Sequence, residues 1–323
     1  MMIRKIVPLL IVLAVFMTAC TKADKQDKTT INVAALKGPT GMGMIKLIND
    51  AEKGSTKNEY NITLAGSPDE ITGKIVSGEI QIAALPINLA ANLYNKTNGK
   101  IQLLALNTLG VLYVLEKGEE INSVSDLEGR KIFATGQGAT PEYVLDYILK
   151  KNNINAEVEY KTEHSELAAL ALSGNADIVM LPEPFVTNVL SKDAGFRIAL
   201  DLTEEFEKVS EGTILSMGCI VVNKEFADKN RQAVNNFIDE YKASTEFVNN
   251  NISEASELIV KHGILASKEL AEKAIPNCNI VCIDGSEMEQ KIKGFYELLN
   301  EYNPNSIGGK LHGDDFYYRR LAV

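Results

Sequence analysis

Two stretches of the chain, about a hundred residues apart, share one pattern. Residues 77–94 read SGEIQIAALPINLAANLY, and residues 173–190 read SGNADIVMLPEPFVTNVL. Six positions match at one constant offset: Ser77/Ser173, Gly78/Gly174, Ile82/Ile178, Leu85/Leu181, Pro86/Pro182 and Asn92/Asn188. In each copy a glycine ends an amphipathic run and a short apolar segment follows, as where a helix leads into a buried strand. The repeat therefore predicts two similar units of helix and strand.

Expected strands and helices alternate throughout both units. In the first unit we expect strands at 31–36, 60–67 and 80–86, and helices at 45–54, 68–78 and 87–99. In the second unit the same order runs through 127–154, 156–162, 164–174 and 176–192. Glycine-rich loops also correspond, with KGPTGMG at 37–43 and TGQGATPE at 135–142. Such alternation indicates the α/β class with a mostly parallel sheet.

The chain of 323 residues is long enough for two lobes and a buried core. Apolar stretches near 108–118 and 213–222 are expected to cross between the lobes. The first lobe would then comprise 31–115 and 216–323, and the second lobe 116–215. The C-terminal part is helical and is expected to pack on the first lobe through one apolar helix face: Val234, Phe237, Ile238, Tyr241, Thr245 and Val248.

The first twenty residues differ from the rest of the chain. Arg4 and Lys5 precede an apolar run at 6–16, and MTAC follows, ending at Cys20. This order predicts a secretory signal peptide, too short for a spanning helix, and a cysteine at that place resembles a lipobox. A transmembrane anchor or an ordinary cleaved signal are the alternatives. Residues 21–30 are polar and are expected to form a flexible tether, so the folded part would be extracytoplasmic and membrane-anchored.

Charge and cysteine content exclude several classes of function. A net charge of −10 argues against nucleic acid or an anionic membrane surface as the main partner. Cys278 and Cys282 are four apart in an expected strand, which is too far for a disulfide. We expect these two and Cys219 to be structural thiols. The three histidines are scattered and none is expected in a strand-end loop, so neither a metal site nor a cofactor is predicted.

Two similar lobes joined by two crossings place equivalent loops on either side of a cleft. In open α/β sheets ligands bind at the carboxyl ends of strands, and two crossings can act as a hinge that closes on a ligand. The chain, with its lipobox, DLEGRKI at 126–132 and ALSGNADIVMLPEP at 171–184, resembles the substrate-binding proteins of bacterial ABC importers, in particular the nitrate, sulfonate, taurine and thiamine-precursor group. This resemblance, over about 31–320, implies a type II periplasmic-binding fold and a membrane permease with its ATPase as partners. A monomer is expected.

The resemblance and the strand-end rule together give the candidate ligand-binding residues. In the first lobe they are Gly38, Pro39, Thr40, Gly41, Ser67, Pro68, Asn88 and, near the first crossing, Thr108. In the second lobe they are Gly136, Gln137, Gly138, Ala139, Thr140, Glu183, Pro184 and Phe185. Glycine and threonine would offer backbone N–H groups and hydroxyls, and Phe185 a stacking face or a core residue beneath the loop.

Arginine is scarce in these loops, which disfavours a strongly anionic ligand held by bidentate pairs. Helix N-termini alone could still hold a small acid. Glu183 would suit an amine or an aminopyrimidine, or it would stabilise its own loop, and together these points favour a neutral or nitrogen-rich solute.

Two other classes of function remain open. A ligand-sensing ectodomain would have the same cleft, and enzymes of menaquinone or thiamine-pyrimidine biosynthesis resemble this fold, although no paired nucleophile and base are evident and no phosphate-binding loop for ATP occurs.

Overall fold

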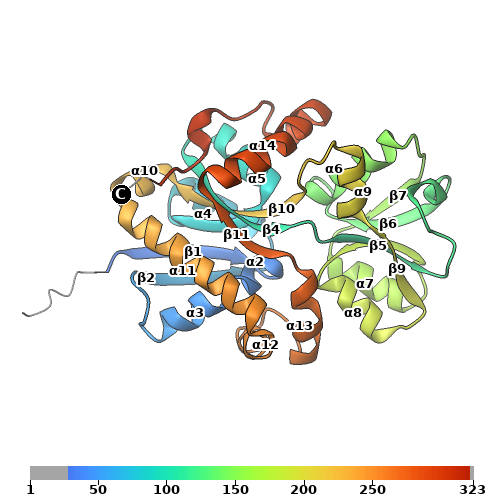
Figure 1. Ribbon diagram of the computed structural model, residues 1–323, viewed down its shortest axis with the longest axis horizontal. Helices are drawn as coiled ribbons and strands as arrows, with labels where there is room; N and C mark the ends of the chain where they lie inside the picture. Colours follow the sequence, from blue (N-terminus) through green and yellow to red (C-terminus); the bar gives the residue numbers. More distant parts are fainter. Residues whose placement is uncertain (1–27, 321–323) are drawn as a thin grey trace, which may run out of the picture.

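The computed structural model describes residues 28–320, which form two lobes side by side (Figure 1). Each lobe is built around one β-sheet that carries helices on its faces. The expected signal peptide, Cys20 and most of the expected tether lie outside the described residues. None of the helices within residues 28–320 combines the length and the apolar character needed to span a membrane.

The first lobe contains a six-stranded sheet in the order β11-β4-β10-β3-β1-β2. Its strands are β1 (Thr30–Leu36), β2 (Glu59–Ala65), β3 (Ile82–Pro86), β4 (Ile101–Leu109), β10 (Ser216–Asn223) and β11 (Ile280–Asp284). β1 runs parallel to both of its neighbours, whereas β10 and β11 run antiparallel to the strands beside them. The central strands are apolar almost throughout because helices cover both faces of the sheet.

The second lobe contains a five-stranded sheet in the order β7-β6-β8-β5-β9. Its strands are β5 (Leu112–Lys117), β6 (Lys131–Thr135), β7 (Glu157–Lys161), β8 (Ile178–Pro182) and β9 (Phe196–Asp201). β8 lies between a parallel partner, β6, and an antiparallel partner, β5. β3 of the first lobe likewise lies between parallel β1 and antiparallel β10. The two repeated segments therefore occupy the same place in two similar sheets.

The prediction of the two-lobe α/β fold is confirmed, but the prediction of a mostly parallel sheet is wrong. In each sheet three neighbouring strands on one side are parallel, β3-β1-β2 and β7-β6-β8, and the strands next to the crossings join them antiparallel. The apolar pattern could not reveal this, because a strand buried on both faces has the same composition in either direction.

Helices flank both sheets. In the first lobe they are α2 (Pro39–Met42), α3 (Ile45–Glu52), α4 (Asp69–Ser77) and α5 (Ile87–Lys96). The second lobe has η1 (Val124–Leu127), α6 (Thr140–Lys151), α7 (His164–Leu172), α8 (Phe185–Lys192) and α9 (Leu202–Val209). The C-terminal part adds α10 (Lys224–Lys229), α11 (Arg231–Asn250), α12 (Ile252–Lys261), α13 (Lys268–Ala274), η2 (Ile275–Asn277), α14 (Gly285–Tyr302), η3 (Pro304–Ile307) and η4 (Asp314–Phe316).

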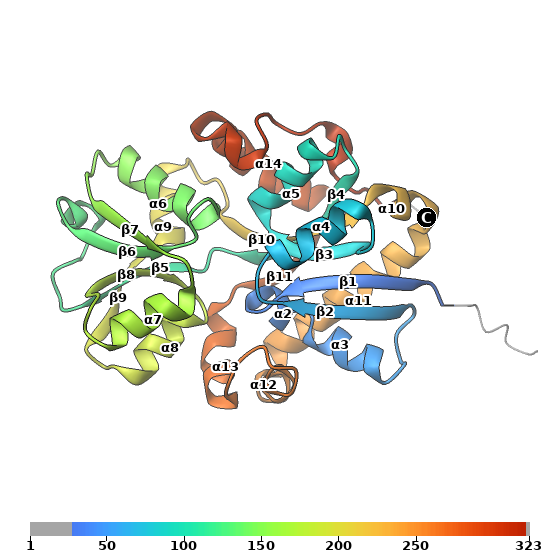
Figure 2. The same ribbon diagram turned by 180° about the vertical axis from the view of Figure 1, so that it is seen from behind.

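Two segments connect the lobes (Figure 2). The first is the link between β4 and β5, where Gly110 and Val111 separate a strand of one sheet from a strand of the other. The second returns from α9 to β10 through residues 210–215. The first change of sheet thus falls a few residues before the expected boundary at 115. The apolar run continues across Gly110 without a break, so hydropathy gives no sign of the change.

The C-terminal helices pack mainly on the first lobe. The predicted buried face of α11 is confirmed, since Val234, Phe237, Ile238, Tyr241, Thr245 and Val248 are all buried. α14 also reaches the second lobe. Its Phe295 ring lies 5.8 Å from that of Phe206 on α9, and Tyr302 lies 5.9 Å from Tyr147 on α6. α14 therefore joins the two lobes on one side through aromatic contacts.

The cysteines of the described part are free, with Cys219 and Cys278 buried and Cys282 partly buried. Burial in apolar surroundings raises the pKa of the Cys219 thiol well above its ordinary value, which makes this thiol unreactive.

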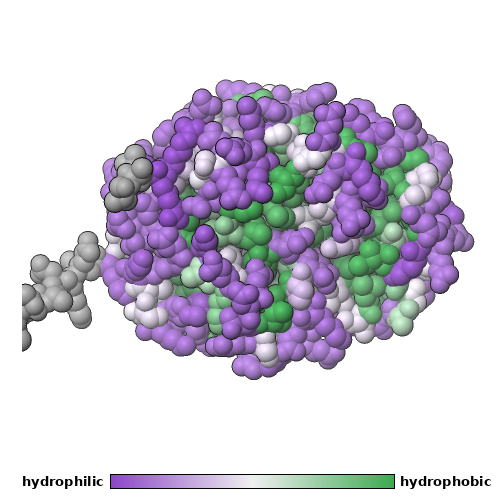
Figure 3. Space-filling model, in the orientation of Figure 1, coloured by the Kyte–Doolittle hydropathy of each residue, from purple (hydrophilic) through white to green (hydrophobic). Residues whose placement is uncertain are grey.

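The outer surface is largely hydrophilic, and apolar residues come to the surface near the middle of the face in Figure 3.

Candidate functional site

A cavity of about 310 Å³ lies between the lobes, at the carboxyl ends of the central strands. The first lobe and the crossings line it with Leu36, Lys37, Gly38, Pro39, Thr40, Gly66, Pro68, Pro86, Thr108, Val111, Met217 and Gly218. The second lobe lines it with Gly136, Ala139, Thr140, Pro141, Thr162, His164, Pro182, Glu183, Pro184 and Phe185. Proline and other apolar side chains dominate both walls. Ligand sites at this place of a two-lobed α/β protein have such apolar walls with a few polar groups.

Most of the predicted site residues lie on this cavity. Those that line it are Gly38, Pro39, Thr40, Pro68, Thr108, Gly136, Ala139, Thr140, Glu183, Pro184 and Phe185. The remaining ones, Gly41, Ser67, Asn88, Gln137 and Gly138, lie beside it or behind it and do not line it. Gly41, for example, is packed so tightly that a Cβ would approach the carbonyl oxygen of Leu36 to 2.7 Å. Contact with a ligand stays a prediction for all of them.

Thr108 lines the cavity, but its hydroxyl is buried. It sits near the end of β4, directly before the crossing. Only 3% of its surface is exposed, and its Oγ1 has almost no accessible surface and no hydrogen-bond partner among the described residues. The hydroxyl is therefore enclosed by the protein and does not open into the cavity.

His164 lines the cavity from the second lobe, although it lies at the start of a helix and not in the strand-end loop itself. β7 ends at Lys161, and His164 opens α7 three residues later. Its Nδ1 lies 2.6 Å from Oγ1 of Thr135, and its ring centroid lies 5.2 Å from that of Phe185. Burial lowers the pKa of His164 to about 4. The imidazole is therefore neutral at pH 7, and its Nε2 has no hydrogen-bond partner among the described residues.

Glu183 lies at the cavity but directs its carboxylate to its own helix. Its two oxygens accept hydrogen bonds from the backbone N–H of Thr187 at 3.1 Å and from the Thr187 hydroxyl at 2.9 Å. Only 2% of its surface is exposed, and this burial raises its pKa. Of the two roles that the sequence left open, these contacts favour the stabilisation of the loop before α8.

Thr140 and Asn88 join the lobes at the edge of the cavity. The Thr140 hydroxyl, at the start of α6, donates to Oδ1 of Asn88 at 3.1 Å, near the start of α5. Both residues are buried. Asn88 in turn donates through Nδ2 to the carbonyl of Ser306, at 3.4 Å. Asn88 thus holds the two helix starts together and is covered by Thr140, which explains why it does not line the cavity.

The residues that sequence reasoning missed also follow strand ends. Leu36, Gly66, Pro86 and Pro182 are last in their strands or directly after them, so the rule used for their neighbours would have found them. Met217 and Gly218 are different, since they lie within β10. They reach the cavity because β10 inserts between β3 and β4, which no local pattern reveals.

The site has no arrangement suited to metal chemistry. Within residues 28–320, no group of three or more His, Cys, Asp or Glu side chains is placed to hold a metal ion. Thr135, the partner of His164, is 1% exposed and does not line the cavity. The cavity combines apolar walls with one neutral imidazole, that of His164.

Comparison with known proteins finds a matching family and solved structures of the same architecture. Residues 100–255 match the family described as NMT1/THI5 like. The resemblance inferred from the sequence is thereby confirmed. An ABC transporter structure from Parabacteroides distasonis is 27% identical, with a TM-score of 0.77 over 91% of this chain and 100% of that chain. No curated protein matches the sequence.

More distant structures share the fold alone. The periplasmic aliphatic sulphonate binding protein SsuA of Escherichia coli is 14% identical, with a TM-score of 0.72 over 89% of this chain and 96% of that chain. The desulfurization enzyme DszB is 10% identical, with a TM-score of 0.64 over 90% of this chain and 97% of that chain. The same fold thus serves binding proteins and an enzyme, so the function must be argued from the site.

Proposed function

We propose that this protein is the lipid-anchored substrate-binding protein of an ABC importer and captures a small, uncharged organic solute between its lobes. The observation that carries the proposal is the cavity between the lobes, which strand ends and loops of both lobes line. The match to the NMT1/THI5-like family and the similarity to the Parabacteroides distasonis ABC transporter support a role in import. A permease and an ATPase would be its partners, and it would act as a monomer.

The lining of the cavity supports an uncharged solute. No arginine lines it, and the one lysine, Lys37, is exposed at its edge. His164 is neutral at pH 7, and the carboxylate of Glu183 is hydrogen-bonded to Thr187. The groups left for a ligand are the imidazole of His164 and the ring of Phe185. A nitrogen-rich ring of modest size would suit both.

Closure of the lobes on the solute is part of the proposal. The cavity takes its walls from both lobes, so a ligand that touches both stabilises the form in which they are close. The bond between Thr140 and Asn88 forms only when the starts of α5 and α6 meet. The short link at Gly110 and Val111 and the segment 210–215 would serve as the hinge.

A thermal-shift screen of the purified full chain tests the proposal. It should include pyrimidines and other uncharged heterocycles, flavins, amino acids, sulfonates and nitrate. A solute at about 100 times its dissociation constant stabilises the folded form by about 2.7 kcal/mol. We expect a clear rise in melting temperature with one uncharged class. A folded chain that shows no shift with any class, and that releases no bound solute on denaturation, would contradict the proposal.

Catalysis is the second candidate, and one observation favours it: His164 lies at the cavity, as an acid or base would. Its hydrogen-bond partner is a threonine, however, and no carboxylate orients the ring among the described contacts. Mass spectrometry of the solute before and after incubation with the chain separates the two functions, because a binding protein returns the solute unchanged.

A further inference from the structure

His164 and Thr135 form a hydrogen-bonded pair beside the cavity. Nδ1 of His164 lies 2.6 Å from Oγ1 of Thr135, which is the last residue of β6. Thr135 is 1% exposed and does not line the cavity, whereas His164 does. The pair therefore has one buried member, the hydroxyl, and one member that reaches the cavity, the imidazole.

The two ring nitrogens of His164 lie in different surroundings. Nδ1 is held by Thr135, whereas Nε2 has no hydrogen-bond partner among the described residues. Nε2 is also not one of the fully enclosed polar atoms, in contrast to Nε2 of His262. Because His164 lines the cavity, Nε2 is the nitrogen that a solute can reach. Burial lowers the pKa of His164 to about 4, so the ring is neutral at pH 7 and carries its proton on only one of the two nitrogens.

The Thr135 hydroxyl decides which nitrogen carries the proton. Its only hydrogen-bond partner within residues 28–320 is Nδ1 of His164. If Nδ1 carried the proton, it would donate to Oγ1, and the hydroxyl hydrogen of the buried threonine would have no acceptor. If Nε2 carries the proton, the hydroxyl donates to the bare Nδ1, and Nε2–H meets water or a solute in the cavity. A buried donor without a partner is costly, so the second arrangement is favoured.

The other polar side chains of the lining leave few donors for a solute. The hydroxyls of Thr40 and Thr140 already donate within the chain, and that of Thr108 is enclosed by the protein. Lys37 and Thr162 line the cavity but are exposed. The imidazole therefore supplies the half-buried side-chain donor of the described lining that no other residue uses.

We propose that Thr135 is a positioning residue: it holds the His164 ring with Nε2–H toward the cavity, so that the site selects solutes that present a ring nitrogen or a carbonyl oxygen there. This inference rests on the proposed function, since it takes the cavity as the solute site. The ring of Phe185, whose centroid lies 5.2 Å from that of His164, places an apolar surface beside the donor. A donor next to an aromatic face suits a heterocycle with an acceptor at its edge.

Long-range proton–nitrogen NMR of the isotope-labelled full chain at neutral pH tests the first step without a ligand. Protonated and bare ring nitrogens have well-separated shifts, and the chain has three histidines, so the signals lost in His164→Gln are those of His164. We expect Nε2–H in the wild type and in Thr135→Ser, which keeps the hydroxyl. Thr135→Val removes the hydroxyl and should populate both tautomers. A wild type with Nδ1–H overturns the inference, and so does a valine variant, folded by circular dichroism, that keeps Nε2–H alone.

NMR titrations with pyrimidine and benzene, two rings of nearly the same shape, test the recognition step. Pyrimidine offers ring-nitrogen acceptors and benzene offers none. His164→Phe should weaken pyrimidine binding about three- to tenfold and change benzene binding little. In that background Thr135→Val should have no further effect on pyrimidine binding, because Thr135 acts through the imidazole.

Two outcomes would overturn the acceptor preference. Equal losses for both rings in His164→Phe would show that His164 only shapes the wall, and a wild type that binds neither ring would show that the site does not recognise such an acceptor. Failure of the proposed function is a separate result, read from the solute screen, and the tautomer measurement does not depend on it.

Discussion

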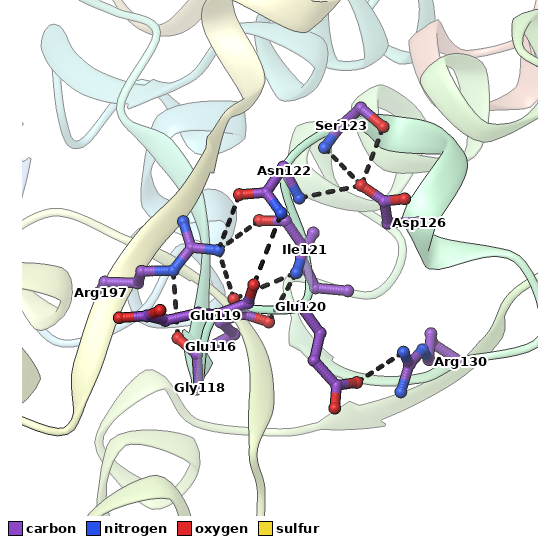
Figure 4. Close-up of polar contacts among 10 residues, drawn as sticks. All are labelled: Glu116, Gly118, Glu119, Glu120, Ile121, Asn122, Ser123, Asp126, Arg130 and Arg197. Atoms are coloured by element: carbon purple, nitrogen blue, oxygen red, sulfur yellow. Dashed lines mark hydrogen bonds and ion pairs between the residues drawn. The ribbon is translucent and has the colours of Figure 1, made fainter.

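Glu116 lies buried beneath the turn that follows β5, with 3% of its surface exposed (Figure 4). Its carboxylate accepts two hydrogen bonds from the Ile121 backbone N–H, at 3.1 and 3.0 Å, and pairs with Arg197 of β9. The Arg197 guanidinium also donates to the carbonyls of Gly118 and Ile121, at 3.1 and 2.6 Å. One arginine thus neutralises a buried charge and holds the whole turn at 118–122 in place.

Replacement of Arg197 by alanine should therefore lower the free energy of unfolding by about 2–4 kcal/mol, because it leaves Glu116 buried without its partner. Urea unfolding followed by circular dichroism measures the change. Arg130→Ala is the matched control, since its ion pair with Glu120, at 2.6 Å, is exposed. That change should cost less than about 1 kcal/mol. Equal effects of the two substitutions would show that burial does not set the strength of the pair.

His164 makes the free energy of unfolding depend on pH. Burial lowers its pKa to about 4, against about 6.5 in an unfolded chain. Between these values the unfolded chain binds a proton that the folded chain does not, so stability rises with pH. The stability associated with the neutral, buried His164 is fully present above about pH 6.5 and is lost as the pH falls toward about 4. The raised pKa of Glu183 acts in the opposite direction.

Substitution of His164 by glutamine isolates this effect, because Glu183 is present in both chains and cancels in the difference. The unfolding free energy of the wild type, relative to the variant, should fall by about 2–3 kcal/mol between about pH 7 and pH 4. Urea titrations of both chains at four or more pH values measure it. A difference that stays constant with pH would mean that His164 titrates normally in the folded chain.

At the scale of elements, the starts of α5 and α6 carry the contact between the lobes. These two helices belong to different sheets, and the hydroxyl of Thr140 bonds to Asn88 across the gap. On the same side, the side-chain amine of Lys150 on α6 lies 4.8 Å from the ring centroid of Tyr302 on α14. The two lobes thus meet through a buried hydrogen bond near the cavity, through aromatic contacts further away, and through the packing of α13 on α8.

Thr140→Val removes the hydroxyl with little change in shape and should weaken binding of the solute found in the screen by about three- to tenfold. The unliganded chain should keep its fold. Calorimetric titration gives the affinity. Thr97→Val is the control: Thr97 is also buried, but its hydroxyl donates to the Leu93 carbonyl within α5. If both variants bind the solute as tightly as the wild type does, the hydrogen bond between Thr140 and Asn88 plays no part in closure.

At the scale of the whole molecule, the described fold begins next to the expected tether. β1 starts at Thr30, on the outer part of the first lobe (Figure 1). The cavity lies between the lobes, at the other end of β1. An anchor at Cys20 would therefore hold the protein at a membrane without covering the site.

Cys20→Ser should release the protein from the membrane fraction and leave solute affinity unchanged, because the substitution removes only the acylated thiol. Fractionation of cells that express each chain, followed by titration of the released protein, measures both effects. Retention of the serine variant in the membrane would favour a transmembrane anchor, and a loss of affinity would contradict the role of 21–30 as a mere tether.

The sequence by itself determined the two α/β units, their repeat and the buried face of α11. Each depends on local chemistry: apolar periodicity, glycine at helix ends and proline at helix starts act within a few residues. The strand-end rule also brought most of the predicted site residues to one cavity, because parallel strands of a sheet end at the same edge.

Only the tertiary structure decided the rest. The antiparallel direction of β10, the place of Met217 within the site and the aromatic bridge from α14 to the second lobe depend on contacts between residues far apart in the chain. The hydrogen-bond partners of the polar groups also could not be predicted from the sequence. Glu183 could have faced a ligand or its own loop, and His164 could have been charged or neutral. Burial and geometry decide between these states, and the spacing of residues in the sequence does not predict them.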